Sequence, residues 1–182
     1  MQTEVKKYMY DDYVNLPEGS AYQLINGELI MSPAPNLYHQ KILNNILILL
    51  NNFNSKINFG DIYPSPVDVY FEEYETYQPD IVFVSKERSQ ILKETKIEGA
   101  PDLVIEILSE SSAYYDLKHK KNIYEKYGVK EYWIVDPIDK SVEIYENKKE
   151  KFDLIEQKKS NGTIKSKILN GLKISIEEIF KP

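Results

Sequence analysis

The segment from Asp102 to Leu108 constrains the fold more than any other, because it reads Asp-Leu-Val-Ile-Glu-Ile-Leu. Side chains of a strand alternate between the two faces of its sheet, and both faces of this strand are apolar except at Glu106. A strand of this kind lies in the middle of a sheet that is covered on both sides. The segment therefore predicts a sheet flanked by helices, with one carboxylate in an apolar setting.

The remaining pattern predicts a mixed α/β (α+β) fold with helices, three strands in the middle of the chain, and antiparallel hairpins at both ends. The expected elements are a short helix at 10–16, a hairpin at 22–31 that turns at Asn26-Gly27, a helix at 37–53 capped by Asn36, strands at 66–71, 80–85 and 102–108, a helix at 113–127 closed by Gly128, and strands at 132–135, 142–146, 152–157 and 163–169. We expect one domain spanning residues 1–182, with a mixed central sheet between helices.

Composition excludes several classes of site. The chain of 182 residues has no Cys, which rules out a disulfide framework, a thiolate zinc site and a cysteine nucleophile. No apolar run approaches the roughly 18 residues of a membrane-spanning helix, and Met1–Lys7 has no apolar stretch, so we expect a soluble cytoplasmic protein. A net charge of -6 argues against a protein that coats nucleic acid through bulk charge.

Three polar residues stand where the pattern calls for apolar ones. Glu106 interrupts the central strand, and Asp80 follows Pro79 at the start of another two-sided apolar strand. At 100° per residue, Lys120 lies at the centre of the apolar face of the helix at 113–127, one turn after Asp116. Two carboxylates and a lysine at one sheet edge suit Mg²⁺ and the hydrolysis of a phosphodiester.

Each of these residues also has a structural reading. Glu106 can be a buried partner of Lys120, Asp80 can accept turn hydrogen bonds at a strand start, and Asp116 with Lys120 can be an ordinary helical pair. The other polar residues of interest stay open: His39 contacts the site or a phosphate, or it packs and caps its helix; Asp68 faces the site or solvent; His119 faces solvent.

Four segments together carry a family resemblance: Gln78-Pro79-Asp80, Pro101 to Ser109, Tyr115 to Lys120 with Tyr124, and Gly128 to Pro137. In these segments the chain resembles the Uma-two family of restriction endonucleases, which belongs to the PD-(D/E)XK nuclease superfamily. The resemblance covers nearly the whole chain. The superfamily core of helix, three strands, helix and strand agrees with the order predicted from the pattern.

The resemblance implies Mg²⁺-dependent cleavage of nucleic acid, and our leading hypothesis is an endonuclease that acts on DNA with Mg²⁺, or with Mn²⁺ in its place. Asp80 and Glu106 match the acidic positions of the superfamily motif and would bind the metal, with the Ile107 carbonyl as a third ligand. Leu108 stands where the superfamily motif has a lysine, and Lys120 matches the position to which the family moves that lysine. Glu28 resembles a further family carboxylate, although a hairpin Glu that faces solvent is the alternative.

Two other functions fit the same residues. The chain can be a catalytically silent member that binds nucleic acid or a protein, which the acidic charge favours, or a hydrolase of small nucleotides. Cutting both strands of a duplex with one site per chain is simplest for a two-fold homodimer, so we expect one. Its contact would lie on apolar residues of the C-terminal hairpins: Val142, Ile144, Phe152, Leu154, Ile164, Ile168 and Leu169.

Overall fold

A computed structural model describes residues 6–17, 19–32, 34–109 and 115–182, with side chains from residue 118 onward in the last range. The helices are α1 (Tyr10–Val14), α2 (Leu37–Ile57), α3 (Tyr115–Tyr127) and α4 (Ile176–Ile179), with a 3-10 helix η1 (Lys86–Ile91). The strands are β1 (Tyr22–Ile25), β2 (Glu28–Met31), β3 (Gly60–Pro64), β4 (Val69–Glu72), β5 (Glu75–Tyr77), β6 (Ile81–Ser85), β7 (Ile97–Glu98), β8 (Leu103–Ile107), β9 (Glu131–Asp136), β10 (Ser141–Asn147), β11 (Phe152–Lys159), β12 (Thr163–Lys165) and β13 (Lys173–Ser175).

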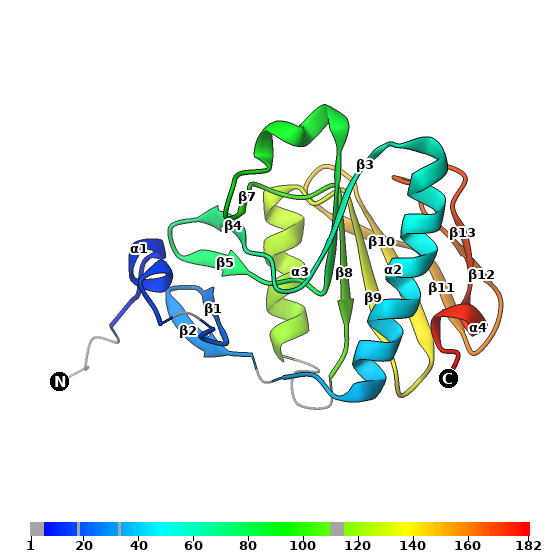
Figure 1. Ribbon diagram of the computed structural model, residues 1–182, viewed down its shortest axis with the longest axis horizontal. Coiled ribbons are helices and arrows are strands. Elements are labelled where there is room, and N and C mark those ends of the chain that lie inside the picture. Colours follow the sequence, from blue (N-terminus) through cyan, green and yellow to red (C-terminus); the bar gives the residue numbers. More distant parts are fainter. Residues whose placement is uncertain (1–5, 18, 33, 110–114) are drawn as a thin grey trace.

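The central sheet has six strands in the order β11-β10-β9-β8-β6-β3, and it is mixed because β8 and β9 run parallel. Helices α2 and α3 cover its opposite faces (Figure 1). On β8, Leu103, Ile105 and Ile107 pack in the α2 core, while Val104 packs in the α3 core. The prediction of a central strand covered on both sides is confirmed, and Glu106 points to the α3 side.

A second sheet of five strands, in the order β2-β1-β5-β4-β7, contains the segment predicted at 66–71. The assignment of that segment to the central sheet is wrong, because the neighbour of β6 on this side is β3. β3 escaped the pattern because it is an edge strand with a mostly solvated side, so it shows little apolar alternation. A Cβ at Gly60 would lie 2.2 Å from the Val84 carbonyl oxygen, so the start of β3 requires glycine.

Local signals near the N-terminus behave as the sequence predicts. Asn26 and Gly27 have φ of 50° and 77°, as a tight turn between β1 and β2 requires. The Asn36 side chain accepts a hydrogen bond from the His39 amide at 2.8 Å and so caps α2. This cap fixes the first turn of α2, which carries the His39 side chain toward the sheet.

Strands β10 and β11 extend the central sheet, whereas β12 and β13 form a separate two-stranded sheet whose apolar residues pack in the α2 core. The strand predicted at 163–169 ends at Lys165, because the buried Glu131 carboxylate then accepts hydrogen bonds from Ser166, Lys167 and Ile168, and also from Trp133. The apolar residues expected at a subunit contact are largely used within the chain: Val142, Ile144, Phe152, Ile164 and Leu169 are buried in its own cores, whereas Leu154 is exposed. Within the described residues, no helix has the length and apolar character needed to cross a bilayer.

Candidate active site

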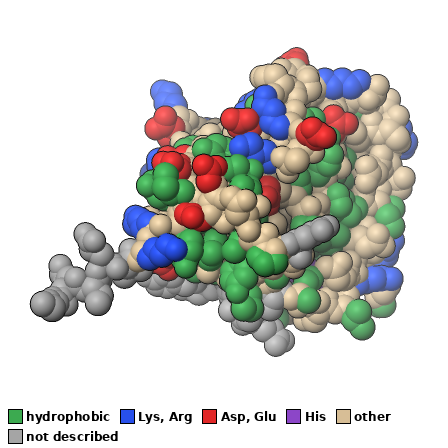
Figure 2. Space-filling model, turned by 60° about the vertical axis from the view of Figure 1, so that its left-hand side comes forward, with side chains coloured by type: hydrophobic (Ala, Val, Ile, Leu, Met, Phe, Trp, Pro, Cys, Tyr) green, Lys and Arg blue, Asp and Glu red, His purple; other side chains and the backbone are tan. Residues whose placement is uncertain are grey.

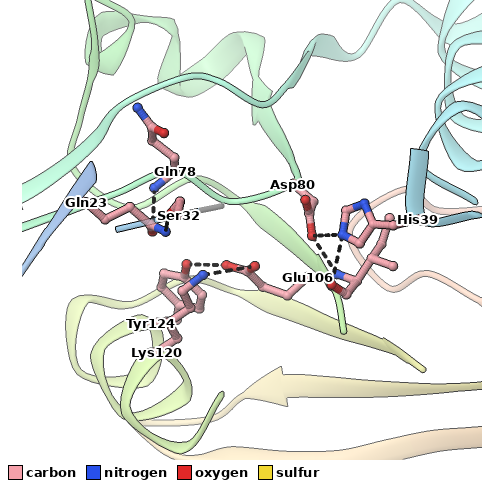
Figure 3. Close-up of polar contacts among 9 residues, drawn as sticks. Gln23, Ser32, His39, Gln78, Asp80, Glu106, Lys120 and Tyr124 are labelled. Atoms are coloured by element: carbon pink, nitrogen blue, oxygen red, sulfur yellow. Dashed lines mark hydrogen bonds and ion pairs between the residues drawn. The ribbon is translucent and has the colours of Figure 1, made fainter. Parts of the chain in front are cut away.

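Asp80 lies beside the end of β8 because β6 and β8 are antiparallel and Ile81 pairs with Ile105. The Asp80 Oδ2 accepts a hydrogen bond from the Ile107 amide at 2.7 Å, which ties the first acidic residue to the strand that carries the second (Figure 3). The Asp80 side chain keeps 16% of its surface exposed. Asp80 therefore lies directly before β6 and beside the strand that carries Glu106, as the predicted neighbouring positions require, and the sharing of one metal ion by the two carboxylates stays a prediction.

Glu106 turns toward α3, where two side chains of that helix hold its carboxylate. Lys120 Nζ lies 3.2 Å from Oε2, and the Tyr124 hydroxyl donates to Oε1 at 2.6 Å (Figure 3). All three side chains are buried, so the predicted orientation of Lys120 is confirmed. Burial and the negative charge of Glu106 raise the pKa of the Tyr124 phenol well above its usual value, so it stays protonated and donates.

His39 reaches the site from the first turn of α2. Its Nε2 atom lies 3.1 Å from the Ile107 carbonyl oxygen and 3.4 Å from Asp80 Oδ2. Burial alone would lower the pKa of the imidazole, but the hydrogen bond and charge of Asp80 outweigh it and the pKa is raised. His39 thus meets the two atoms that the resemblance assigns, together with Glu106, to a metal.

Sequence reasoning missed Tyr124 and left His39 open, although a signal existed for each. His39 precedes Ile42, Leu43 and Ile46 at helical spacing, so it belongs to the buried stripe of its helix. Tyr124 stands one turn after Lys120 on the inner face of α3. A polar group on a buried helix face needs a partner, and both residues find theirs at the site.

The other candidate residues lie elsewhere. Glu28 is exposed on β2, in the five-stranded sheet, and takes no part in the contacts described above. The Asp116 side chain lies outside the described residues. Asp68 is half-buried and accepts hydrogen bonds from Tyr13 and Gln78. The prediction that His119 faces solvent is wrong, because the side chain is half-buried and its Nε2 atom is buried with no hydrogen-bond partner in the described part of the chain.

An uncharged network supports the segment that leads into Asp80. The buried Gln23 side chain accepts a hydrogen bond from the Gln78 amide at 3.0 Å and donates to Ser32 Oγ at 2.5 Å (Figure 3). Gln78 precedes Asp80 by two residues, so this network links β1 of the second sheet to the acidic residue. The second sheet thereby helps to fix the position of Asp80.

The donor atoms fit a divalent cation. Asp80 Oδ2 and the Ile107 carbonyl oxygen are hard oxygen donors that both lie next to His39 Nε2, and Glu106 lies on the same strand as Ile107. Within the described residues, no three His, Asp or Glu side chains come close enough together to hold an ion by themselves. A cation here would therefore use the main-chain carbonyl and solvent as well as side chains.

Comparison with known proteins agrees with the fold and places the chain in a family. A solved protein from Anabaena variabilis, described as a "putative nuclease belonging to DUF820", has the same fold with a TM-score of 0.77 and 22% identity over 93% of this chain and 96% of that one. No curated protein matches the chain. The model of the Uma2 family, described as "Putative restriction endonuclease", matches residues 10–177. The chain therefore belongs to the Uma2 family.

Proposed function

We propose that this protein is a metal-dependent nuclease that hydrolyses phosphodiester bonds of DNA. The observation that carries the proposal is that Glu106 on β8 pairs with Lys120 of α3, while Asp80, directly before β6, accepts a hydrogen bond from Ile107, the next residue of β8. Burying the Glu106 carboxylate and the Lys120 ammonium, and half-burying the Asp80 carboxylate, costs free energy, and catalysis is a reason to retain these groups. Membership of the Uma2 family supports the same reaction class.

In this proposal Asp80, Glu106 and the Ile107 carbonyl would hold Mg²⁺ or Mn²⁺. When bound, the metal supplies charge that polarises a phosphoryl oxygen and acidifies the attacking water. Lys120 places an ammonium at the Glu106 carboxylate, where it would orient that water or neutralise negative charge developing on the phosphate. Tyr124 holds Glu106 in place through its hydroxyl.

A second candidate is a silent member of the fold that binds nucleic acid or a protein. Both oxygens of Glu106 already have partners on α3, which is also how a purely structural carboxylate is satisfied. The net charge is -6, and on the described surface in Figure 2 acidic and basic side chains are interspersed rather than gathered into one basic area.

The decisive experiment is a nuclease assay of the purified chain on supercoiled plasmid, single-stranded DNA and RNA, with Mg²⁺, with Mn²⁺ or with a chelator. We expect metal-dependent cleavage of DNA that is lost in Lys120→Met, because the variant lacks the ammonium group. The fold should be retained, because Met fills the same space without leaving a buried unpaired cation. Lys118→Met, at an exposed position of the same helix, is the matched control and should cut normally. Equal activity of Lys120→Met and the wild type would refute the proposed role of Lys120, and no cleavage by a folded wild type would favour the silent module.

We further propose that the active form is a homodimer, because two copies related by a two-fold axis cut a duplex most simply. Light scattering at micromolar concentration should then give twice the chain mass of 21.3 kDa. A mass of one chain would exclude the dimer and favour nicking or single-strand cleavage by the same site.

A further inference from the structure

His39 contacts two of the three groups that are proposed to hold the metal ion. Its Nε2 atom contacts both the Ile107 carbonyl oxygen and Asp80 Oδ2, at 3.1 Å and 3.4 Å. Glu106, by contrast, has its carboxylate turned to Lys120 and Tyr124. An imidazole nitrogen from α2 therefore lies next to both oxygen atoms that are proposed to hold the cation.

These two distances have a simple meaning in coordination geometry. Two ligand atoms on adjacent corners of an octahedron, each about 2.1 Å from the ion, lie about 3.0 Å apart. The separations of His39 Nε2 from the two oxygen atoms are close to such an octahedral edge. One ion can thus contact all three atoms with only small shifts of the side chains.

We propose that His39 is a ligand of the metal ion and makes the site prefer Mn²⁺ or Co²⁺ to Mg²⁺. The inference rests on the proposed metal-dependent function and deepens it by naming the kind of metal. Mg²⁺ takes oxygen ligands almost exclusively, whereas affinity for imidazole rises along the transition series from Mn²⁺ to Co²⁺. An oxygen-only site would give no such preference.

The strength of this ligand is limited by its other ring nitrogen. An imidazole that binds through Nε2 carries its hydrogen on Nδ1, and the Nδ1 of His39 is buried without a hydrogen-bond partner among the described residues. Histidine ligands are usually strengthened by an acceptor for that hydrogen, and loss of such an acceptor costs about 10- to 100-fold in metal affinity. We therefore expect His39 to contribute modestly, about tenfold in Mn²⁺ affinity.

The test is metal binding by the full chain, measured without substrate. Mn²⁺ and Mg²⁺ affinities are determined by calorimetry, and pulsed electron paramagnetic resonance of bound Mn²⁺ detects ¹⁴N coupling from a directly bound imidazole. The variants are His39→Ala and His39→Gln, the second of which keeps an amide donor for Ile107 and Asp80 if the first does not fold. The chain has two histidines, so His119→Ala is the matched control.

We expect ¹⁴N coupling in the wild type and in His119→Ala, and its loss in both His39 variants. The Mn²⁺ dissociation constant should rise about tenfold in the His39 variants, while that of Mg²⁺ changes less than about threefold. Bound Mn²⁺ without ¹⁴N coupling in the wild type, or coupling that survives in His39→Gln, would overturn the ligand role. Failure of the wild type to bind either metal, or binding that persists in Asp80→Asn, would instead overturn the proposed metal-dependent function.

Discussion

The dipeptide Pro-Asp occurs directly before both β6 and β8, as Pro79-Asp80 and Pro101-Asp102. The two aspartates differ in their basic partners and in their exposure. Because these strands are antiparallel, Asp80 caps the end of β8 through the Ile107 amide, and Asp102 caps the end of β6 through the Ser85 amide. Asp102 then receives Lys130 at 2.6 Å and Arg88 at 3.3 Å, and its side chain is only 1% exposed. Asp80 receives the imidazole of His39 and keeps 16% exposure.

Asp80 and Asp102 differ in the number of basic side chains that the protein places beside each carboxylate. Two basic side chains compensate Asp102, so it is complete as a structural joint between two strands and the α3–β9 loop. The only basic side chain paired with Asp80 within the described residues is an imidazole, which leaves room for a cation from solution. The same local motif thus becomes structural or functional according to what packs against it.

Neutralising each aspartate in turn gives the largest expected effects and tests whether Asp80 is functional and Asp102 structural. Asp80→Asn should lower nuclease activity at least about 100-fold while the free energy of unfolding falls by less than about 1 kcal/mol, because Asn still accepts the Ile107 hydrogen bond. Asp102→Asn should cost about 2 to 3 kcal/mol, because two cations lose their partner, with cleavage retained under folding conditions. Urea unfolding and plasmid cleavage measure both quantities, and equal effects of the two variants would contradict the division of roles.

The rise in Tm on addition of Mn²⁺ provides a second comparison of Asp80 with Asp102. At a concentration of Mn²⁺ about 100 times its dissociation constant, binding adds about 2.7 kcal/mol, which raises Tm by roughly 5 to 10 °C for a chain of this length. The increase should persist in Asp102→Asn, starting from a lower Tm, and vanish in Asp80→Asn. Calorimetric scans with and without metal provide the measurement, and an unchanged increase in Asp80→Asn would place the ion elsewhere.

Acid titration tests the contribution of Asp102 to stability, because its lowered pKa makes the free energy of unfolding depend on pH. Burial alone would raise the pKa of Asp102, but hydrogen bonds from Lys130 and Ser85 lower it below its ordinary value of 3.8. The unfolded chain therefore binds the proton first, so this contribution is complete above that value and is lost as pH falls through the folded pKa. Below pH 4 the free energy of unfolding should fall more steeply for the wild type than for Asp102→Asn, and parallel curves would count against the effect.

The smallest effect should come from Lys130→Met. Half of the Lys130 side chain is exposed, and Arg88 and the Ser85 amide remain on Asp102, so we expect a loss of about 0.5 to 1 kcal/mol. Lys118→Met, at an exposed position of α3, provides the reference in the same urea titration. A loss above about 2 kcal/mol would show that Lys130 carries the joint and that Arg88 does not share the charge.

Sequence alone predicted what depends on short-range periodicity. The helical repeat selected Lys120 rather than its lysine neighbours, and the two-sided strand gave Glu106 its apolar surroundings. Strand pairing is a long-range choice, so periodicity did not reveal that β3 flanks β6 or that residues 69–72 join a second sheet. The same limit left the role of His39 open, since its partners Asp80 and Ile107 lie 41 and 68 positions further along the chain.

The buried Glu131 carboxylate links Trp133, a natural optical reporter in the α2 core, to the C-terminal segment. Trp133 is the only tryptophan of the chain, is fully buried, and donates its indole hydrogen to the carboxylate that also holds residues 166–168. Excitation at the red edge of protein absorption therefore reads out one well-defined environment. Detachment of the C-terminal segment should shift that emission to longer wavelength before the sheet itself opens, so partial and global unfolding are distinguishable without any added dye.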